Sequence, residues 1–331
     1  MTEQTASNPI DLFRDTSQAI LNEISKVIVG QNNLIHHLIV TLLAEGNALL
    51  EGVPGLGKTL LVRTLSQILD CSFNRIQFTP DLMPADITGT MIITETPEGR
   101  RGFRFEKGPI FNNLVLADEI NRAAPRTQSA LLEAMQENQV SLEGETLALP
   151  QPFIVLATQN PIEYEGTFPL PEAQLDRFLV RLTLGYPEPA EEQSILQQRR
   201  ERQKETVELE AVLPSNGLLE MQAAVETVYV HPDLEGYIVA IVTETRRDRH
   251  VAVGGSPRAS LALMKLARAQ AALSGREYVL PDDIKAYIHP VLAHRLLLLP
   301  EFWMRKNLIT EVINTALRSV PVPVLSTPEQ G

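Results

Sequence analysis

A glycine-rich segment of eight residues places the strongest constraint on what this chain folds into. Residues 52–59 read Gly-Val-Pro-Gly-Leu-Gly-Lys-Thr, which matches the full phosphate-loop pattern. The short apolar run 47–50 precedes it, as a buried strand would, and the amphipathic run 59–69 follows it. A strand, this loop and a helix in that order are the context that the motif requires. The sequence therefore favours a nucleotide site over a chance glycine-rich turn.

The residue types of this loop suit a triphosphate. Glycines let the backbone curl tightly enough for several N–H groups to converge on phosphate oxygens, and the following helix presents its positive end. Lys58 supplies a point charge for the β- and γ-phosphates, and the Thr59 hydroxyl can ligate Mg²⁺. We therefore expect ATP and Mg²⁺ to bind here. The residues expected to bind them are Gly52, Pro54, Gly55, Leu56, Gly57, Lys58, Thr59 and Leu60.

A second apolar run, 113–117, ends in two acids, Asp118 and Glu119. Alone, they would read as the solvated end of an ordinary strand. Beside a phosphate loop, Asp118 is expected to hold Mg²⁺ through water and Glu119 to orient and polarise the attacking water. Adjacent residues of an extended chain face different directions, so one pair can serve both roles. We expect this strand to lie next to the phosphate-loop strand.

The pattern of apolar runs predicts an α/β core followed by a helical domain. Short β-like runs alternate with helical segments up to residue 186, which indicates a parallel sheet covered on both faces. Two stretches, 87–105 and 139–149, have the alternation and glycine-bearing turns of β-hairpins. After residue 186 the chain reads as helices, the last over 282–289. We predict a nucleotide-binding core over 1–186, a helical lid over 187–320 and a flexible tail over 321–331.

Charge and cysteine content narrow the class of protein. The formal net charge is −12, with −9 in residues 1–185 and −3 in the rest. Nucleic-acid binding usually needs a basic face, so this balance disfavours it. No apolar run approaches the roughly 20 residues of a membrane helix, and the first residues lack a secretory pattern. A single cysteine, Cys71, cannot form an internal disulfide, which favours the reducing cytoplasm.

In these motifs the chain resembles AAA+ ATPases and, within them, the MoxR family. The matching pieces run in order over most of the chain. The acidic motif continues as Asp-Glu-Ile-Asn-Arg-Ala over 118–123, and Leu-Pro-Glu-Ala-Gln-Leu-Asp-Arg-Phe over 170–178 is typical of the family. The segments 29–31, 157–161 and 255–259 resemble the adenine-closing segment, sensor 1 and sensor 2. The two hairpins fall where the family has its helix-2 insert and pre-sensor-1 hairpin.

The resemblance implies further site residues. Val29 and Gly30 would close over the adenine, and Asn160 would be the sensor-1 amide that contacts the γ-phosphate or the water. Arg177 would be the arginine finger that reaches the neighbouring subunit's nucleotide, unless it pairs within its own subunit with Asp176 or Glu172. The sensor-2 arginine would be Arg258, acting in its own subunit or in the next, and Arg122 is either a further interface arginine or part of a surface salt bridge.

The same resemblance implies a ring, because an arginine that acts in trans needs the active site of a neighbouring subunit and a head-to-tail interface that closes makes a cyclic oligomer. A homo-oligomeric hexamer would hydrolyse ATP and remodel a client protein complex in a chaperone-like way. Families of this kind often mature enzymes with metal cofactors or act with partners that carry von Willebrand factor A domains. Three alternatives stay open at this point: a chelatase-type motor subunit, a nucleic-acid-translocating motor, and an assembly scaffold that binds nucleotide without cleaving it.

Overall fold

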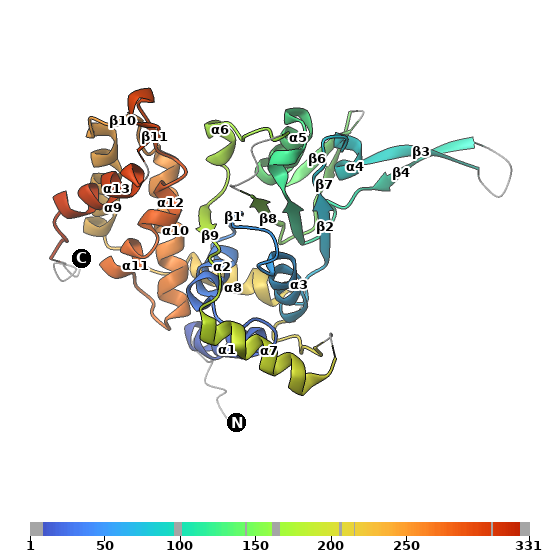
Figure 1. Cartoon of the computed structure of the whole chain (residues 1–331), viewed down its shortest axis with the longest axis horizontal. Helices are drawn as coiled ribbons and strands as arrows, with labels where there is room; N and C mark the ends of the chain where they lie inside the picture. Colours follow the sequence, from blue (N-terminus) through green and yellow to red (C-terminus); the bar gives the residue numbers. More distant parts are fainter. Residues whose placement is uncertain are drawn as a thin grey trace, which may run out of the picture.

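A five-stranded parallel sheet forms the centre of the molecule (Figure 1). The computed structural model describes residues 9–95, 101–142, 144–160, 166–204, 207–214, 216–305 and 307–324. The strands lie in the order β2-β5-β8-β1-β9, so the phosphate-loop strand β1 is flanked by β8 and β9. The strand bounds are β1 Ala48–Glu51, β2 Phe73–Gln77, β5 Leu114–Asp118, β8 Ile154–Gln159 and β9 Val180–Thr183.

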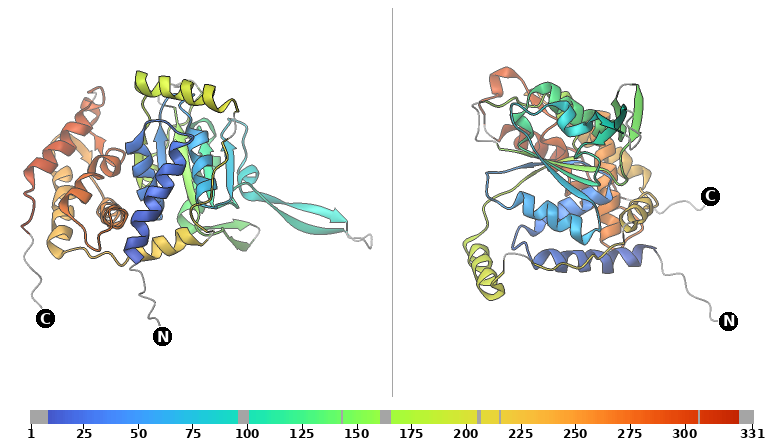
Figure 2. Two further views of the ribbon diagram at one scale, coloured as in Figure 1. Left: turned by 90° about the horizontal axis from the view of Figure 1, so that it is seen from below. Right: turned by 90° about the vertical axis from the view of Figure 1, so that its right-hand side faces the viewer.

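Both faces of this sheet are buried, which explains why its strands read as unbroken apolar runs. Successive side chains of a strand point to opposite faces. Leu114 and Leu116 of β5 accordingly join one hydrophobic cluster, and Val115 and Ala117 join the other. The right-hand view of Figure 2 shows the strands between two layers of helices. Those helices include α1 Pro9–Ser25, α2 Asn32–Leu43 and α3 Lys58–Ile68 on one side and α4 Pro84–Thr88 and α5 Pro125–Glu137 on the other.

One expectation about the sheet is wrong. The strand that carries the two acids, β5, does not lie next to the phosphate-loop strand β1, because β8 pairs with both and separates them. Helices separate the sheet strands along the chain, and strand order in such a sheet depends on long-range pairing that apolar runs do not encode. The carboxyl ends of β1, β8 and β5 still meet at one edge, where the motifs lie.

Two antiparallel hairpins project from the core, as predicted. The first pairs β3 Gly89–Glu95 with β4 Arg101–Lys107 and points away from the lid (Figures 1 and 2). The second pairs β6 Gln139–Leu142 with β7 Glu145–Ala148. The predicted turn at 97–99 and residue 143 lie outside the described residues.

The chain after β9 is mainly helical. Helix α7 Pro189–Arg202 leads to α8 Gly217–Val225, which contacts α1 and α2 of the core. Helix α9 Pro232–Arg247 comes next, and α10 Pro257–Leu273 packs against α1 and α2. The boundary between core and lid at residue 186 stays a prediction. Of the predicted tail, 321–331, residues 325–331 lie outside the described residues.

The lid departs from the expected elements in three places. A small antiparallel sheet, β10 Val251–Val253 with β11 Leu297–Leu298, interrupts the helices. The helix expected over 282–289 is two short helices, α11 Pro281–Lys285 and α12 Ile288–Leu292. Pro290 explains the break, because it has no N–H for the carbonyl four residues earlier and its ring crowds that carbonyl. A last helix, α13 Leu308–Ser319, was not predicted.

Within the described ranges, no helix combines the length and the apolar character that crossing a membrane requires.

Candidate nucleotide site

The phosphate loop adopts the tight bend that its glycines allow. The loop leaves β1 and enters α3 at Lys58. Gly55 and Gly57 have φ values of +86° and +79°, the left-handed region that side chains rarely adopt. At Gly52 the reason is space, since a Cβ atom would lie 2.9 Å from the carbonyl oxygen of Leu184. The three glycines therefore meet local requirements of this bend.

A cavity of about 420 Å³ lies over the loop at the carboxyl ends of the strands. This is where parallel α/β sheets bind ligands. It brings together most of the residues that the motifs predicted, from the loop, from the end of β5 and from the end of β8. The predicted residues that line it are Pro54, Gly55, Gly57, Lys58, Thr59, Leu60, Asp118, Glu119 and Asn160.

Lys58 points back over the loop. Its Nζ donates a hydrogen bond to the carbonyl oxygen of Gly52 at 2.6 Å. Burial lowers the pKa of Lys58, while the nearby charges of Asp118 and Glu119 act in the opposite direction. Two carboxylates thus help to keep an ammonium group charged at the mouth of the cavity, as binding of a polyanion requires.

Asp118 is buried at the end of β5, and both its oxygens are engaged. The hydroxyl of Thr158 donates to Oδ1 at 2.6 Å. Arg75 of β2 donates to Oδ2 through Nε at 3.0 Å and Nη2 at 2.6 Å. The Asp118 carboxylate and the Thr59 hydroxyl both line the cavity, and oxygen donors of this kind fit Mg²⁺.

The backbone leaves the extended conformation of β5 at Glu119. Its φ of +56° is uncommon for a residue other than glycine, and such backbone often marks a functional position. Its backbone N–H donates to the hydroxyl of Thr158 at 2.8 Å. Its Oε2 accepts from Gln77 at 2.9 Å and from Arg122 at 3.0 Å. The carboxylate is therefore held in a fixed direction at the cavity.

Four of these positioning residues were missed or left open by the sequence. Arg75 and Gln77 lie on β2, and the sheet register sets Gln77 opposite Asp118. Thr158 bridges the two acids from β8. Arg122 forms a salt bridge with Glu119 of its own subunit, which is the second of the two roles considered for it. Arg122 and Thr158 lie in the quoted motifs over 118–123 and 157–161, but no local motif marks Arg75 and Gln77, which reach the acids through strand order.

Asn160 follows directly after β8, is buried and lines the cavity. Its place beside the two acids agrees with the expected contact to a γ-phosphate or an attacking water. Leu56 packs instead against the hydrophobic cluster beneath the loop. Val29 and Gly30 lie between α1 and α2, outside the lining of the cavity, and a Cβ at Gly30 would meet the carboxyl group of Glu191 on α7.

The two predicted arginines lie apart from this cavity. Arg177 follows the short helix α6 Glu172–Leu175 and lines a different hollow of about 570 Å³, with residues of α5 and the second hairpin. In the part of the chain that the structure describes, Arg177 has no carboxylate within 4.0 Å, and its neighbour Asp176 pairs with Arg258 and Arg295. Arg258 lies in the first turn of α10, with its side chain 56% exposed.

The fold and this site define an AAA+ ATPase, and the comparisons with known proteins agree. Residues 47–180 match the ATPase family associated with various cellular activities (AAA), and residues 243–316 match the AAA lid domain. A crystal structure of a protein from Cytophaga hutchinsonii, assigned as an ATPase, superposes with a TM-score of 0.89. It is 39% identical and covers 97% of this chain and 99% of its own.

Curated relatives narrow the class further. Chaperone MoxR1 of Mycobacterium tuberculosis is 44% identical over 96% of this chain and 85% of its own length. Protein MoxR of Methylorubrum extorquens is 32% identical over 94% and 96%. The uncharacterized protein YeaC of Bacillus subtilis is 47% identical over 92% and 94%. The chain belongs to the MoxR family of AAA+ ATPases.

Proposed function

We propose that this protein hydrolyses ATP to ADP and phosphate as a ring, most simply a hexamer. Hydrolysis would change the angle between core and lid, and this movement would remodel a client protein complex. The observation that carries the proposal is the separation of Arg177 from the phosphate-loop cavity of its own chain. The cavity holds the phosphate loop, Lys58 and the two acids, while Arg177 faces a different hollow without a carboxylate partner among the described residues. A neighbour in a closed ring would complete the site.

Each residue of the cavity has a role in this proposal. The loop and Lys58 bind the triphosphate, and Thr59 and Asp118 would hold Mg²⁺, which when bound screens charge on the β- and γ-phosphates. Glu119, fixed by Gln77 and Arg122, takes the proton of the attacking water. Asn160 donates a hydrogen bond to the γ-phosphate or the water.

Arg75 lies beside the place expected for the cation, and a cation held directly by Asp118, rather than through water, would have to displace it. Arg75 occupies Oδ2 of Asp118, so binding of a cation at that carboxylate competes with the ion pair. The cation would replace one positive charge by another, which keeps the buried carboxylate compensated.

The client side of the proposal rests on shape and on the relatives. The first hairpin projects far from the core and carries Ile93 and Phe103 opposite one another, both largely exposed. The name of the Mycobacterium tuberculosis relative describes it as a chaperone. A change in the angle between core and lid would be transmitted to such a hairpin, and a partner with a von Willebrand factor A domain would deliver or select the client. We place this activity in the cytoplasm.

The test is a mixing experiment. Arg177→Ala protein keeps an intact phosphate loop but gives its neighbour no finger, and Lys58→Ala protein has a defective loop but an intact finger. Each alone should release little phosphate, and a mixture should regain activity because some interfaces combine an intact loop with an intact finger. No regain in the mixture would contradict a site shared between subunits.

A client is sought with the Glu119→Gln variant. This variant should bind ATP without cleaving it, and so should retain a polypeptide from an extract of the source cells in ATP that it does not retain without nucleotide. Equal retention with and without ATP would contradict nucleotide-driven remodelling.

A further inference from the structure

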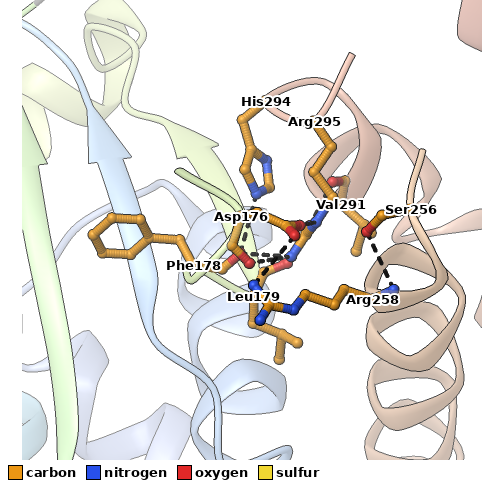
Figure 3. A network of polar contacts seen from close by, with 8 residues as sticks. All are labelled: Asp176, Phe178, Leu179, Ser256, Arg258, Val291, His294 and Arg295. Atoms are coloured by element: carbon orange, nitrogen blue, oxygen red, sulfur yellow. Dashed lines mark hydrogen bonds and ion pairs between the residues drawn. The ribbon is translucent and has the colours of Figure 1, made fainter. Parts of the chain in front are cut away.

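The lid contacts the chain on either side of Arg177, in a network shown in Figure 3. We call residues 176–179 the finger segment, since Arg177 lies within it. Asp176, Phe178 and Leu179 of this segment meet Arg295 and His294, which follow α12 in the lid. These contacts join parts of the chain that lie more than a hundred residues apart in sequence.

All three guanidinium nitrogens of Arg295 donate hydrogen bonds to the finger segment. Its Nε donates to Oδ1 of Asp176 at 2.7 Å, and Nη2 donates to the carbonyl of Phe178 at 2.7 Å. Nη1 donates to the carbonyl of Leu179 at 3.1 Å and to that of Val291, in the lid helix α12, at 2.6 Å. The side chain is only 4% exposed. A planar fork of five N–H donors suits such a set of acceptors, and a lysine could satisfy only part of it.

The core holds the same segment from the other side. Phe178 is fully buried in the cluster beneath the sheet, and the N–H of Leu179 donates to the carbonyl of Asn47 at 2.8 Å. The carbonyls of Phe178 and Leu179 face the lid instead. Arg177 thus lies between two anchors, one in the core and one in the lid.

Two further lid residues strengthen the contact. His294 is buried and its Nε2 meets the carbonyl of Phe178 at 3.1 Å. Arg258 approaches the second oxygen of Asp176, Oδ2, at 3.5 Å. One carboxylate next to Arg177 therefore touches both Arg295 and the predicted sensor-2 arginine, so the position of the lid bears directly on the finger segment.

We propose that Arg295 is a positioning residue for the arginine finger. It fastens the finger segment to the lid of its own protomer, so that Arg177 reaches the neighbour's γ-phosphate only when that lid is in place. The lid of one subunit thereby sets the cleavage rate in the next subunit. This inference rests on the proposed function, in which Arg177 acts across the subunit boundary.

Arg295→Lys is the direct variant, because it keeps the charge but cannot fill the acceptors of the finger segment. A finger displaced by about 1 Å should lower kcat for ATP about 10²-fold, while KM for ATP and ring size stay unchanged. Asp176→Asn is the second variant, which keeps every carbonyl contact of Arg295 and should show a smaller loss of the same kind. Arg276→Lys is the matched control, since Arg276 forms a part-buried ion pair with Asp283 within the lid and touches no finger residue.

Mixing separates this role from a general weakening of the lid. Arg295→Lys protein, mixed with Lys58→Ala protein, should regain phosphate release, because its own loop is intact and the Lys58→Ala neighbour lends a correctly held finger. Arg177→Ala mixed with Lys58→Ala runs in parallel. Regain in both mixtures supports the inference, and a control Arg276→Lys protein with activity near wild type supports it further.

Three results would contradict it in different ways. Regain with Arg177→Ala but not with Arg295→Lys would overturn the role of Arg295 and leave the shared site intact. No regain with Arg177→Ala would overturn the proposed function and this inference with it. A loss in Arg276→Lys equal to that in Arg295→Lys would also overturn the inference, since any weakened lid would then have the same effect.

Discussion

The phosphate-loop cavity and the finger segment are built in opposite ways. The cavity gathers groups from the ends of β1, β2, β5 and β8 within one rigid sheet, and its acids are held by Thr158, Gln77 and Arg75. The finger segment follows a four-residue helix and is held largely by the lid, through Arg295. One region is fixed by the core alone, whereas the other depends on how core and lid sit together. In our account, the first binds nucleotide and the second decides when the neighbour's nucleotide is cleaved.

The largest expected effect is that of Arg177→Ala, which should change the turnover rate but not the affinity for ATP. Arg177→Ala should lower kcat about 10³-fold or more, because an arginine finger stabilises charge only in the transition state. The dissociation constant for ATP should not change, since Arg177 lies outside the cavity of its own chain. Phosphate release and binding of a fluorescent ATP analogue measure the two quantities. A loss of binding equal to the loss of turnover would show that Arg177 serves its own subunit.

Glu119→Gln should be the largest defect inside the cavity. The amide keeps the size of the side chain but cannot take a proton, so turnover should fall about 10²- to 10⁴-fold. ATP binding and ring assembly should persist. Mixing distinguishes this variant from Arg177→Ala. A mixture of Glu119→Gln and Lys58→Ala proteins should regain no activity, because neither protein has a working nucleotide site.

Lys58→Ala should act on binding. Removing one charge-assisted hydrogen bond to phosphate should weaken ATP binding roughly 10- to 100-fold, which corresponds to about 1.4–2.8 kcal/mol. Equilibrium titration with the same fluorescent analogue checks it. Unchanged binding would mean that the bond from Lys58 to Gly52 persists when nucleotide is bound.

Gln77→Ala should have a modest effect. It removes one of two hydrogen bonds to Glu119 and leaves Arg122 in place, so turnover should fall a few-fold, in line with about 0.5–1.5 kcal/mol for one hydrogen bond. Gln67→Ala, an exposed glutamine on α3, is the control and should match wild type. A defect as large as that of Glu119→Gln would assign Gln77 a direct contact with the reacting groups.

The smallest expected effect concerns the lid contact and pH. Burial lowers the pKa of His294 well below 6.5, with the charge of Arg295 acting in the same direction. The unfolded chain takes up a proton near pH 6.5 and the folded chain does not, so the free energy of unfolding should fall as pH drops below about 6.5. One such group contributes up to about 1.4 kcal/mol per pH unit.

Denaturant titrations between pH 5 and pH 7 would measure this slope. His294→Gln removes the titrating ring and should flatten it. Part of the slope should remain, because burial also lowers the pKa of His37. An unchanged slope in His294→Gln would show that His294 does not stay neutral in the folded protein.

The features that depend on short local motifs were predicted from the sequence. The phosphate loop, the pair Asp118 and Glu119, and both hairpins follow local spacing rules, and the structure has the loop, the strand end and the hairpins where they were expected. Asn160 was found through a resemblance that also rests on a short local motif. Their roles in binding and cleavage remain proposals.

The remainder depends on distant pairing. The place of β8 between β1 and β5 was not predicted, and Gln77 meets Glu119 only because β2 pairs with β5 in one particular register. The contact of Arg295 with Asp176 spans 119 residues of sequence. No periodicity or spacing encodes such contacts, since they follow from how whole elements pack.

The most direct test of a site shared between subunits is the rate of phosphate release per subunit over a dilution series, with particle size measured in the same samples. Our account predicts that the rate per subunit falls steeply as the ring dissociates and that isolated subunits still bind ATP. A monomer that hydrolyses ATP at the full rate would contradict it.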